Sequence, residues 1–323
     1  MRSPSMSKSV ARRVTPRPLH TPMYREPVRV HRLGPRDVDE VCERVGARVA
    51  TAARRCALLE GTLDRDALRA AVESVAPAWV ARSRGRIVGH LTATLLDGTG
   101  RAWVPPDGTS FDDPAVLGAL LEAAAPAWRD AGAHGLSAWA YDDPIEVGAW
   151  AACGATLRAR RGVRALSTGD AGPAAGLGLR RAGRGDLELA LALDRWGDPP
   201  GAPAPGDDER RHEVVALLED PEVDYLVAEL DGRAVAQAVV MSLPARRGSR
   251  ANAVHLSAVA VDPDRRGRGL GTALVGSVLE RARSVGYAAA EVNWRTADPR
   301  VERFWRGRGF TPTHALVEGV LPA

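Results

Sequence analysis

The segment Val259-Ala-Val-Asp-Pro-Asp-Arg-Arg-Gly-Arg-Gly-Leu-Gly-Thr-Ala-Leu274 joins a strand pattern to a helix pattern through a basic, glycine-rich turn. The alternating strand pattern has one face made by His255, Ser257, Val259 and Val261. Pro263 has no N–H for a sheet ladder and marks the end of this strand. A helical pattern follows from residue 270 to about residue 285. Because such a turn aims backbone N–H groups and the positive end of a helix at one point, it predicts a phosphate-binding site.

The residues of the turn suit an anion. Gly267, Gly269 and Gly271 remove side chains where phosphates would approach the backbone. Positive charge comes from Arg265, Arg266 and Arg268. In a chain rich in Arg and Gly the bare pattern is weak, and the strand before it and the helix after it give it weight. An ordinary tight strand–helix turn is the alternative interpretation.

The chain also contains an internal repeat. Asp143-Pro144, with Trp150 and Gly154 behind it, recurs as Asp298-Pro299, followed by Trp305 and Gly309 at the same spacing. Each half predicts the order strand, helix, helix, three strands, helix, strand, helix, strand. The chain of 323 residues is therefore predicted to be a tandem duplication of an α/β domain with a mixed sheet.

The predicted division of the chain follows the repeat. We expect a disordered basic tail at 1–26, a first domain at 27–166, a linker at 167–177 and a second domain at 178–323. The tail lacks the apolar segment of a secretory signal; a transit peptide, or a true start at Met23, are alternatives. Within the first domain the predicted elements are strand 28–33, helices 35–53 and 64–75, hairpin 79–94, strand 101–104, helix 114–131, strand 136–140, helix 144–151 and strand 158–165.

The two halves differ where the glycine-rich turn lies. The first half instead has Pro105-Pro-Asp-Gly-Thr-Ser-Phe-Asp-Asp-Pro114, in which Asp112 and Asp113 would repel a pyrophosphate. We therefore expect the first half to keep the fold without binding the phosphate-bearing cofactor that the glycine-rich turn predicts for the second half. The first half would complete the substrate cleft or stiffen the pair of domains.

The composition suits a soluble α/β protein, since 45% of residues are hydrophobic and no run is long enough to span a membrane. The net charge of +4 comes from 44 basic residues mixed with 40 acidic ones, which favours a solvated surface over a nucleic-acid partner. Cys42, Cys56 and Cys153 have no metal-binding spacing, so we expect a reducing cytoplasm and no metal. The abundance of Ala, Arg, Gly and Pro suggests a bacterial protein with a high-GC genome, and we expect a monomer or homodimer.

Val261-Asp-Pro-Asp-Arg-Arg-Gly-Arg-Gly-Leu-Gly-x-x-Leu274 resembles the acetyl-CoA-binding motif of the GNAT (Gcn5-related) superfamily of N-acetyltransferases. The repeated halves resemble the tandem GNAT proteins of actinobacteria, with a weak similarity to mycothiol synthase. The resemblance implies two GNAT-like domains, each with a centrally splayed sheet, and transfer of an acetyl group from acetyl-CoA to a primary amine of a small molecule in the second. The cofactor-binding residues that it implies are Val259, Val261, Arg266, Gly267, Arg268, Gly269, Leu270, Gly271, Thr272 and Asp298.

Direct attack by an amine requires a base, because an alkylammonium is not nucleophilic. His255 is the predicted base, since it lies on the strand before the turn and its intrinsic pKa suits proton transfer near neutrality. The arylalkylamine-type branch of the superfamily places a histidine similarly. Glu291 is the second candidate, with Asn293 beside it. The thioester oxyanion would take a backbone N–H at a bulge between the two central strands.

The acid is harder to assign. The superfamily pattern Asn-x-x-Ala-x-x-x-Tyr-x-x-x-Gly-Phe reads here Asp298, Val301, Trp305, Gly309 and Phe310. An indole N–H cannot act as a proton donor at any useful pH. Either the thiolate leaves without an acid, or Tyr225 or Tyr287 serves, or the chemistry is impaired.

Two other functions stay open at this point. The missing tyrosine and the degenerate first half motivate one of them, a non-catalytic acyl-CoA-binding or interaction module. The other is nucleic-acid binding through the basic tail. For the enzyme, the acceptor would meet the loop 196–209, where Trp196 and four carboxylates suit a cationic amine. A solvated acidic loop is the alternative.

Overall fold

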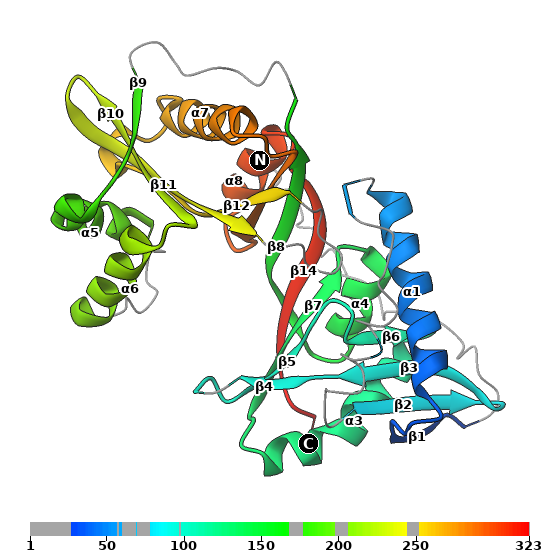
Figure 1. Cartoon of the computed structure of the whole chain (residues 1–323). Coiled ribbons are helices and arrows are strands. Elements are labelled where there is room, and N and C mark those ends of the chain that lie inside the picture. Colours follow the sequence, from blue (N-terminus) through cyan, green and yellow to red (C-terminus); the bar gives the residue numbers. More distant parts are fainter. Residues whose placement is uncertain are drawn as a thin grey trace, which may run out of the picture.

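The computed structural model describes residues 27–56, 58–59, 69, 78–96, 98–167, 177–197, 206–243 and 252–322. It is an α/β protein with a ten-stranded mixed sheet, in the order β4-β5-β7-β14-β8-β13-β12-β11-β10-β9, and a four-stranded sheet, in the order β1-β2-β3-β6 (Figure 1). The predicted α/β class with mixed sheets is confirmed.

The first half follows the predicted order. Its described elements are β1 (Arg29–Arg32), α1 (Val38–Arg55), β2 (Ala78–Ser83), β3 (Arg86–Thr92), β4 (Thr94–Leu96), β5 (Arg101–Val104), β6 (Thr109–Phe111), α3 (Pro114–Asp130), β7 (Gly135–Tyr141), α4 (Pro144–Ala152) and β8 (Thr156–Ala165). The second strand of the predicted hairpin 79–94 is interrupted at Ala93, which gives β3 and β4. The predicted strand 101–104 is β5, and β6 is a further short strand that was not predicted. The predicted helix 64–75 lies outside the described residues, apart from residue 69.

The second half repeats the plan. Its elements are β9 (Leu177–Arg181), η1 (Arg184–Asp186), α5 (Leu187–Asp194), η2 (Arg195–Gly197), α6 (Asp207–Glu219), β10 (Val223–Leu230), β11 (Arg233–Leu243), β12 (Ala253–Val261), η3 (Pro263–Arg265), α7 (Leu270–Ser284), β13 (Ala289–Arg295), α8 (Pro299–Gly307) and β14 (Thr311–Val320).

The repeated Asp-Pro pairs form the same local structure in both halves. Asp143 is the N-cap of α4 and accepts hydrogen bonds from the N–H groups of Ile145 and Glu146. Asp298 is the N-cap of α8 and accepts one from the N–H of Arg300. Proline at the first helical position sacrifices no hydrogen bond, because the N–H there has no intrahelical partner. The repeated Asp-Pro pair therefore forms the same N-cap at the start of α4 and of α8.

The halves are joined by an exchange of their last strands, which the sequence did not predict. β14, from the second half, lies between β7 and β8 of the first half. β8, from the first half, lies between β14 and β13 of the second. Figure 1 shows β8 and β14 side by side through the centre of the molecule. The exchange makes one continuous sheet; the boundary at 167–177 stays a prediction, since 168–176 lie outside the described residues.

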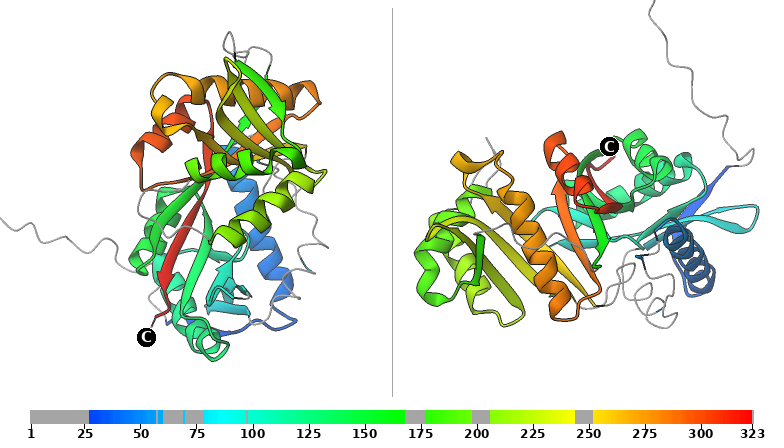
Figure 2. Two further views of the ribbon diagram at one scale, coloured as in Figure 1. Left: turned by 90° about the vertical axis from the view of Figure 1, so that its left-hand side faces the viewer. Right: turned by 90° about the horizontal axis from the view of Figure 1, so that it is seen from above.

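Helices cover both faces of the sheets (Figure 2). In the second half, Leu274, Val275 and Val278 of α7 pack with β12 and β13 on one face. Helices α5 and α6 cover the other face, around Leu191 and Val214. Among the described helices, none combines the length and apolar content needed to cross a membrane.

Candidate functional site

Two neighbouring central strands of the second half separate part-way along their length. β12 pairs with β13 only from Ala253 to Leu256. Beyond that point β12 keeps its pairing with β11, while β13 keeps its pairing with β8. At the same level β12 contains a bulge, because Val239 lies opposite Ala258 and Val240 opposite Leu256. The V-shaped splay thus opens at Ser257, the extra residue of the bulge.

The bulge corrects one sequence prediction. His255 was expected on the same face as Val259 and Val261, but the extra residue reverses the alternation between them. Val254, Leu256, Val259 and Val261 pack on the α7 face. Ala258 packs on the opposite face, with α5 and α6. His255 therefore faces the α5/α6 side of the sheet, not the side of the predicted pantetheine-binding valines.

The backbone of Val259 and Val261 points into the splay. The N–H of Asp262 donates to the carbonyl of Val235 on β11, at 2.9 Å. In an antiparallel ladder, hydrogen-bonded and non-hydrogen-bonded pairs alternate. Counting back from Asp262, Val261 and Val259 fall in non-hydrogen-bonded positions toward β11. Their N–H and C=O groups therefore point toward the side where β13 has moved away.

The glycine-rich turn ends at an uncapped helix N-terminus. Gly267 and Gly269 have φ of 78° and 81°, a region that disfavours side chains. Gly269 is the N-cap of α7, and no side chain hydrogen-bonds to the helix there. An added Cβ at either glycine would meet nothing within 4 Å. The turn thus offers free N–H groups and open space to an anion, and acetyl-CoA carries such a group in its pyrophosphate.

The other predicted turn residues have mixed surroundings. Arg268 is exposed. Arg266 donates to the carbonyls of Val261 at 3.2 Å and Trp196 at 2.8 Å, so its side chain links β12 to η2, the short helix after α5. The hydroxyl of Thr272 accepts from Arg308 at 2.7 Å. Leu270 begins α7, and Gly271 packs close to Phe304 and Val261.

The side chain of Asp298 caps the N-terminus of α8. Besides accepting from the N–H of Arg300, its carboxylate forms an ion pair with the Arg300 guanidinium at 2.8 Å. The bonds from Arg300, its side chain first, hold the pKa of Asp298 below the usual value. A cofactor contact by Asp298 stays a prediction beside this structural use.

His255 and Glu291 lie together at the base of the splay. They are register partners on β12 and β13, and His255 Nδ1 lies 3.6 Å from Glu291 Oε1. The side chain of Glu291 is 3% exposed and that of His255 13%. Arg161, from β8 of the first half, places its Nε 3.3 Å from the same carboxylate oxygen. Sequence reasoning missed Arg161, because only the strand exchange brings it here.

None of the three residues considered as the general acid, Trp305, Tyr225 and Tyr287, is positioned to protonate the leaving thiolate. Trp305 is buried between Phe304 and Phe310, with edge-to-face ring contacts at 5.0 and 5.3 Å. The hydroxyl of Tyr225 donates to the Ala190 carbonyl and bonds Gln237, and burial raises its pKa. The hydroxyl of Tyr287 bonds Ser242, and Tyr287 lies beside the start of β12, at the far end from the turn.

In the first half, the position that corresponds to the glycine-rich turn is closed to an anion. Asp113 is the N-cap of α3 and accepts from the N–H of Ala115 at 2.8 Å. Pro114 has no N–H, and the N–H of Val116 already donates to the Asp113 carbonyl. Asp112 pairs with Arg44 at 2.6 Å. The start of α3 is therefore filled by the chain's own carboxylate.

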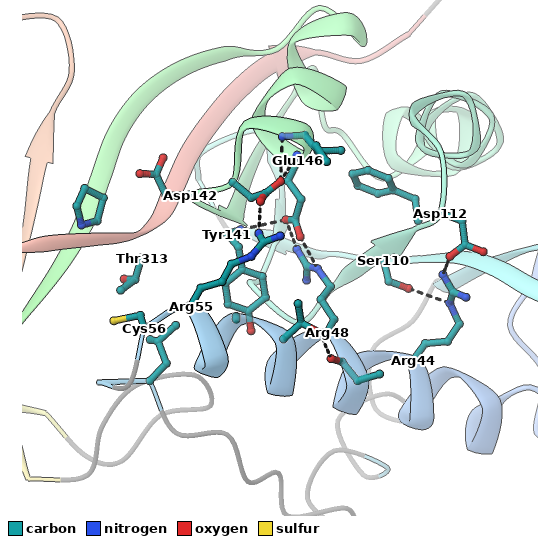
Figure 3. Close-up of a pocket in the computed structure, with 18 of the residues that line it drawn as sticks. Arg44, Arg48, Arg55, Cys56, Ser110, Asp112, Tyr141, Asp142, Glu146 and Thr313 are labelled. Atoms are coloured by element: carbon teal, nitrogen blue, oxygen red, sulfur yellow. Dashed lines mark hydrogen bonds and ion pairs between the residues drawn. The ribbon is translucent and has the colours of Figure 1, made fainter. Parts of the chain in front are cut away.

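The first half nevertheless contains a cavity of about 450 Å³ between α1, the start of α4 and the exchanged strand β14. Figure 3 shows Arg44, Arg48 and Arg55 reaching into it from one side of α1. Each is paired with an acid: Arg44 with Asp112, Arg48 with Glu146 at 2.5 Å, and Arg55 with Asp143. The helical spacing of these arginines was a visible signal, but their acidic partners lie too far along the chain for local pattern to find.

The comparisons with known proteins agree with this geometry. A model of the acetyltransferase (GNAT) family matches residues 190–310. A GCN5-related N-acetyltransferase from Sphaerobacter thermophilus shares the fold over 92% of this chain and 96% of its own, with a TM-score of 0.60 and 16% identity. A tandem GNAT protein from the clavulanic acid biosynthesis pathway does so over 92% and 99%, with a TM-score of 0.54 and 17% identity.

A glucosamine N-acetyltransferase region of a fungal multi-domain β-N-acetylglucosaminidase is also similar, over 92% of this chain and 38% of that one, with a TM-score of 0.54 and 14% identity. No curated protein matches the chain. The similarity to mycothiol synthase stays a prediction. Residues 190–310 therefore match the GNAT acetyltransferase family, and along nearly its whole length the chain has a fold similar to that of a GCN5-related N-acetyltransferase and a tandem GNAT protein.

Proposed function

We propose that the protein is an acetyl-CoA-dependent N-acetyltransferase that acetylates a primary amine of a small molecule in its second half. One contrast carries the proposal. The start of α7 is an open glycine turn with no cap, beside the splay between β12 and β13. The start of α3 in the first half is capped by Asp113. One acetyl-CoA per chain is therefore expected.

In this proposal the splay binds the extended arm of acetyl-CoA. The N–H groups of Val259 and Val261 would pair with its pantetheine, and the turn from Arg266 to Gly271 would hold its pyrophosphate. The thioester would then lie at the level of the Ser257 bulge. A backbone N–H of the bulge would donate to the oxyanion as the amine attacks.

His255 would take the proton from the attacking amine. Its Nδ1 faces Glu291, so an Nδ1–H would point to the carboxylate and Nε2 would accept the proton, directly or through a water. Glu291 would stabilise the imidazolium that forms. No hydroxyl acid is placed for the thiolate, which would leave unassisted in this scheme.

Calorimetric titration of acetyl-CoA tests the binding part of the proposal. We expect one site per chain in the wild type and loss of binding in Gly269→Glu, because a carboxylate there would occupy and repel the pyrophosphate position. Gly232→Glu is the matched control, since Gly232 also has a positive φ and open space but lies in the β10–β11 turn. Binding of two molecules, or equal loss in both variants, would contradict the assignment.

Turnover is tested by release of free thiol from acetyl-CoA with a panel of primary amines. We expect His255→Gln to lower kcat by roughly 10²- to 10⁴-fold, the usual contribution of a general base, with little change in acetyl-CoA affinity. An unchanged kcat would remove His255 from the mechanism.

A non-catalytic acyl-CoA-binding module is the second candidate, and the burial of Trp305 favours it. Binding of acetyl-CoA without turnover of any amine would support this alternative. For either function we expect a cytoplasmic bacterial protein, monomeric or homodimeric, with no nucleic-acid partner. The acceptor loop proposed at 196–209 lies mostly outside the described residues.

A further inference from the structure

The site at the base of the splay contains a charged side chain from the other half of the chain. Arg161 lies on β8, opposite Asn293 of β13. Its Nε lies 3.3 Å from Glu291 Oε1 and donates to Asn293 Oδ1 at 3.2 Å. His255 Nδ1 approaches the same Glu291 oxygen at 3.6 Å. One carboxylate oxygen is thus shared between the candidate base and an arginine of the first half.

The surroundings fix this arginine in place. Its guanidinium lies over the ring of Trp139, with 4.5 Å from Cζ to the ring centroid. Trp139 belongs to β7, also in the first half, and is 5% exposed. The side chain of Arg161 is itself 14% exposed. A planar cation held between an aromatic face and a carboxylate has little freedom to leave.

A carboxylate as buried as that of Glu291 needs such a partner. Removing an ionised carboxylate from water is costly unless charge and hydrogen bonds compensate it. His255 compensates only when it is protonated, whereas an arginine is always charged. Arg161 therefore keeps Glu291 ionised in the part of the reaction when His255 is neutral and ready to accept a proton.

We propose that Arg161 is a positioning residue for acetyl transfer in the second half, and that the first half thereby completes the active site through its exchanged strand β8. The inference rests on the proposed function, since it assigns a task toward His255 and Glu291. It gives the first half a task that needs no second cofactor.

Among the described residues, three groups that can carry charge face Glu291 on this side of the sheet: His255 from β12, Arg161 from β8 and His314 from β14. Burial, and then Arg161, lower the pKa of His314 to about 3, so it is neutral at working pH. Within the described part of the chain, Glu291 and Arg161 are the charged groups nearest His255. Removing the arginine takes one positive charge from Glu291 and favours the protonated imidazole.

The experiment compares the titration of His255 and the pH dependence of kcat/KM in wild type and Arg161→Gln. The His255 signal in the NMR spectrum is assigned by its absence in His255→Gln. We expect the midpoint of His255, and the acidic limb of kcat/KM, to move up by roughly one pH unit in Arg161→Gln. Arg161→Lys, which keeps the charge, should restore both midpoints and leave a loss of kcat, because lysine lacks the planar fork.

Arg158→Gln is the matched control: it removes one charge from the same strand, where Arg158 pairs with Glu318 at 3.4 Å, and should move neither midpoint. An unmoved His255 midpoint in Arg161→Gln overturns the inference, whether or not any amine is acetylated. A moved His255 midpoint with an unmoved kcat/KM limb overturns the positioning task and leaves the transferase proposal standing.

If Arg161→Gln does not fold, the His255 midpoint is measured in Glu291→Gln, which removes the negative charge instead of the positive one. Arg161 would then face His255 without the carboxylate, and the His255 midpoint should fall. A midpoint that stays at its wild-type value would overturn the inference. Failure of the whole amine panel, by contrast, bears on the proposed function and not on this electrostatic link.

Discussion

Gly162 lies at the centre of the strand exchange and gives its sharpest test. It belongs to β8 and packs against Trp294 of β13, in the other half of the chain. A Cβ at position 162 would lie 2.5 Å from Cζ3 and 2.6 Å from Cη2 of Trp294. Carbon atoms normally stay about 3.5 to 4.0 Å apart, so the ring or the strand would have to move by about 1 Å. Trp294 is 3% exposed and cannot swing into solvent.

Gly162→Ala is therefore expected to lower the free energy of unfolding by about 1 to 3 kcal/mol, the usual range for overpacking a filled core. The measurement is urea denaturation followed by tryptophan fluorescence. Gly178→Ala is the control, because Gly178 is also a strand residue but its added Cβ would meet only the Glu229 carbonyl, at 3.8 Å. This control should cost less than Gly162→Ala.

The double variant Gly162→Ala/Trp294→Phe completes the test. A phenylalanine ring does not reach the positions of Cζ3 and Cη2, so the added methyl group has room. Trp294→Phe alone should destabilise, because it leaves a cavity. The two changes together should cost less than their sum, by about 1 to 2 kcal/mol. Additive effects would mean that Gly162 and Trp294 are not in contact, and would refute the exchange as described.

Three further outcomes follow from single residues. Asp298→Ala should lower the stability of the protein through loss of the α8 cap, and Asp143→Ala should lower the free energy of unfolding by about 1 kcal/mol through loss of the α4 cap. Asn at either position should largely keep the cap, and denaturation curves check both expectations. Burial lowers the pKa of His314 to about 3 in the folded protein, against about 6.5 in the unfolded chain, so the unfolded chain binds one more proton between these pH values. The free energy of unfolding therefore falls as pH falls from about 6.5 toward 3. His314→Gln should reduce the slope of this fall by up to about 1.4 kcal/mol per pH unit, which corresponds to one proton. Tyr225→Phe and Tyr287→Phe should each keep kcat within a few-fold, since neither hydroxyl is placed as the acid; a loss approaching 10²-fold would assign one of them that task.

Local sequence signals predicted the elements well. Periodicity, the paired Asp-Pro caps and the glycine turn placed most described helices and strands within a few residues, because each signal acts over one turn or one hairpin. The contrast between the turn at Gly267–Gly269 and the carboxylates at Asp112–Asp113 also follows from local chemistry. The structure shows an uncapped helix in one half and a capped helix in the other.

The remaining features depend on contacts between distant segments. Strict alternation predicted His255 on the face of Val261, and the bulge at Ser257 reversed that order because an extra residue breaks the period of two. The pairing of β8 with β13 leaves no trace in the pattern of either strand, since an alternating strand pairs equally well with several neighbours. Arg161 therefore looked like one surface arginine among many.

The exchange gives a physical reason to keep a first half whose own anion site is closed. In an isolated segment 178–323, β13 would lack β8 and β14 would lack both of its neighbours. Their edges would expose unpaired N–H and C=O groups that invite association with other chains. Glu291 would lose its ion pair with Arg161, which offsets part of the cost of burying its carboxylate. The first half thus supplies both sheet pairing and charge to the second. Because the two halves are parts of one chain, β14 and β8 are always present together and can pair.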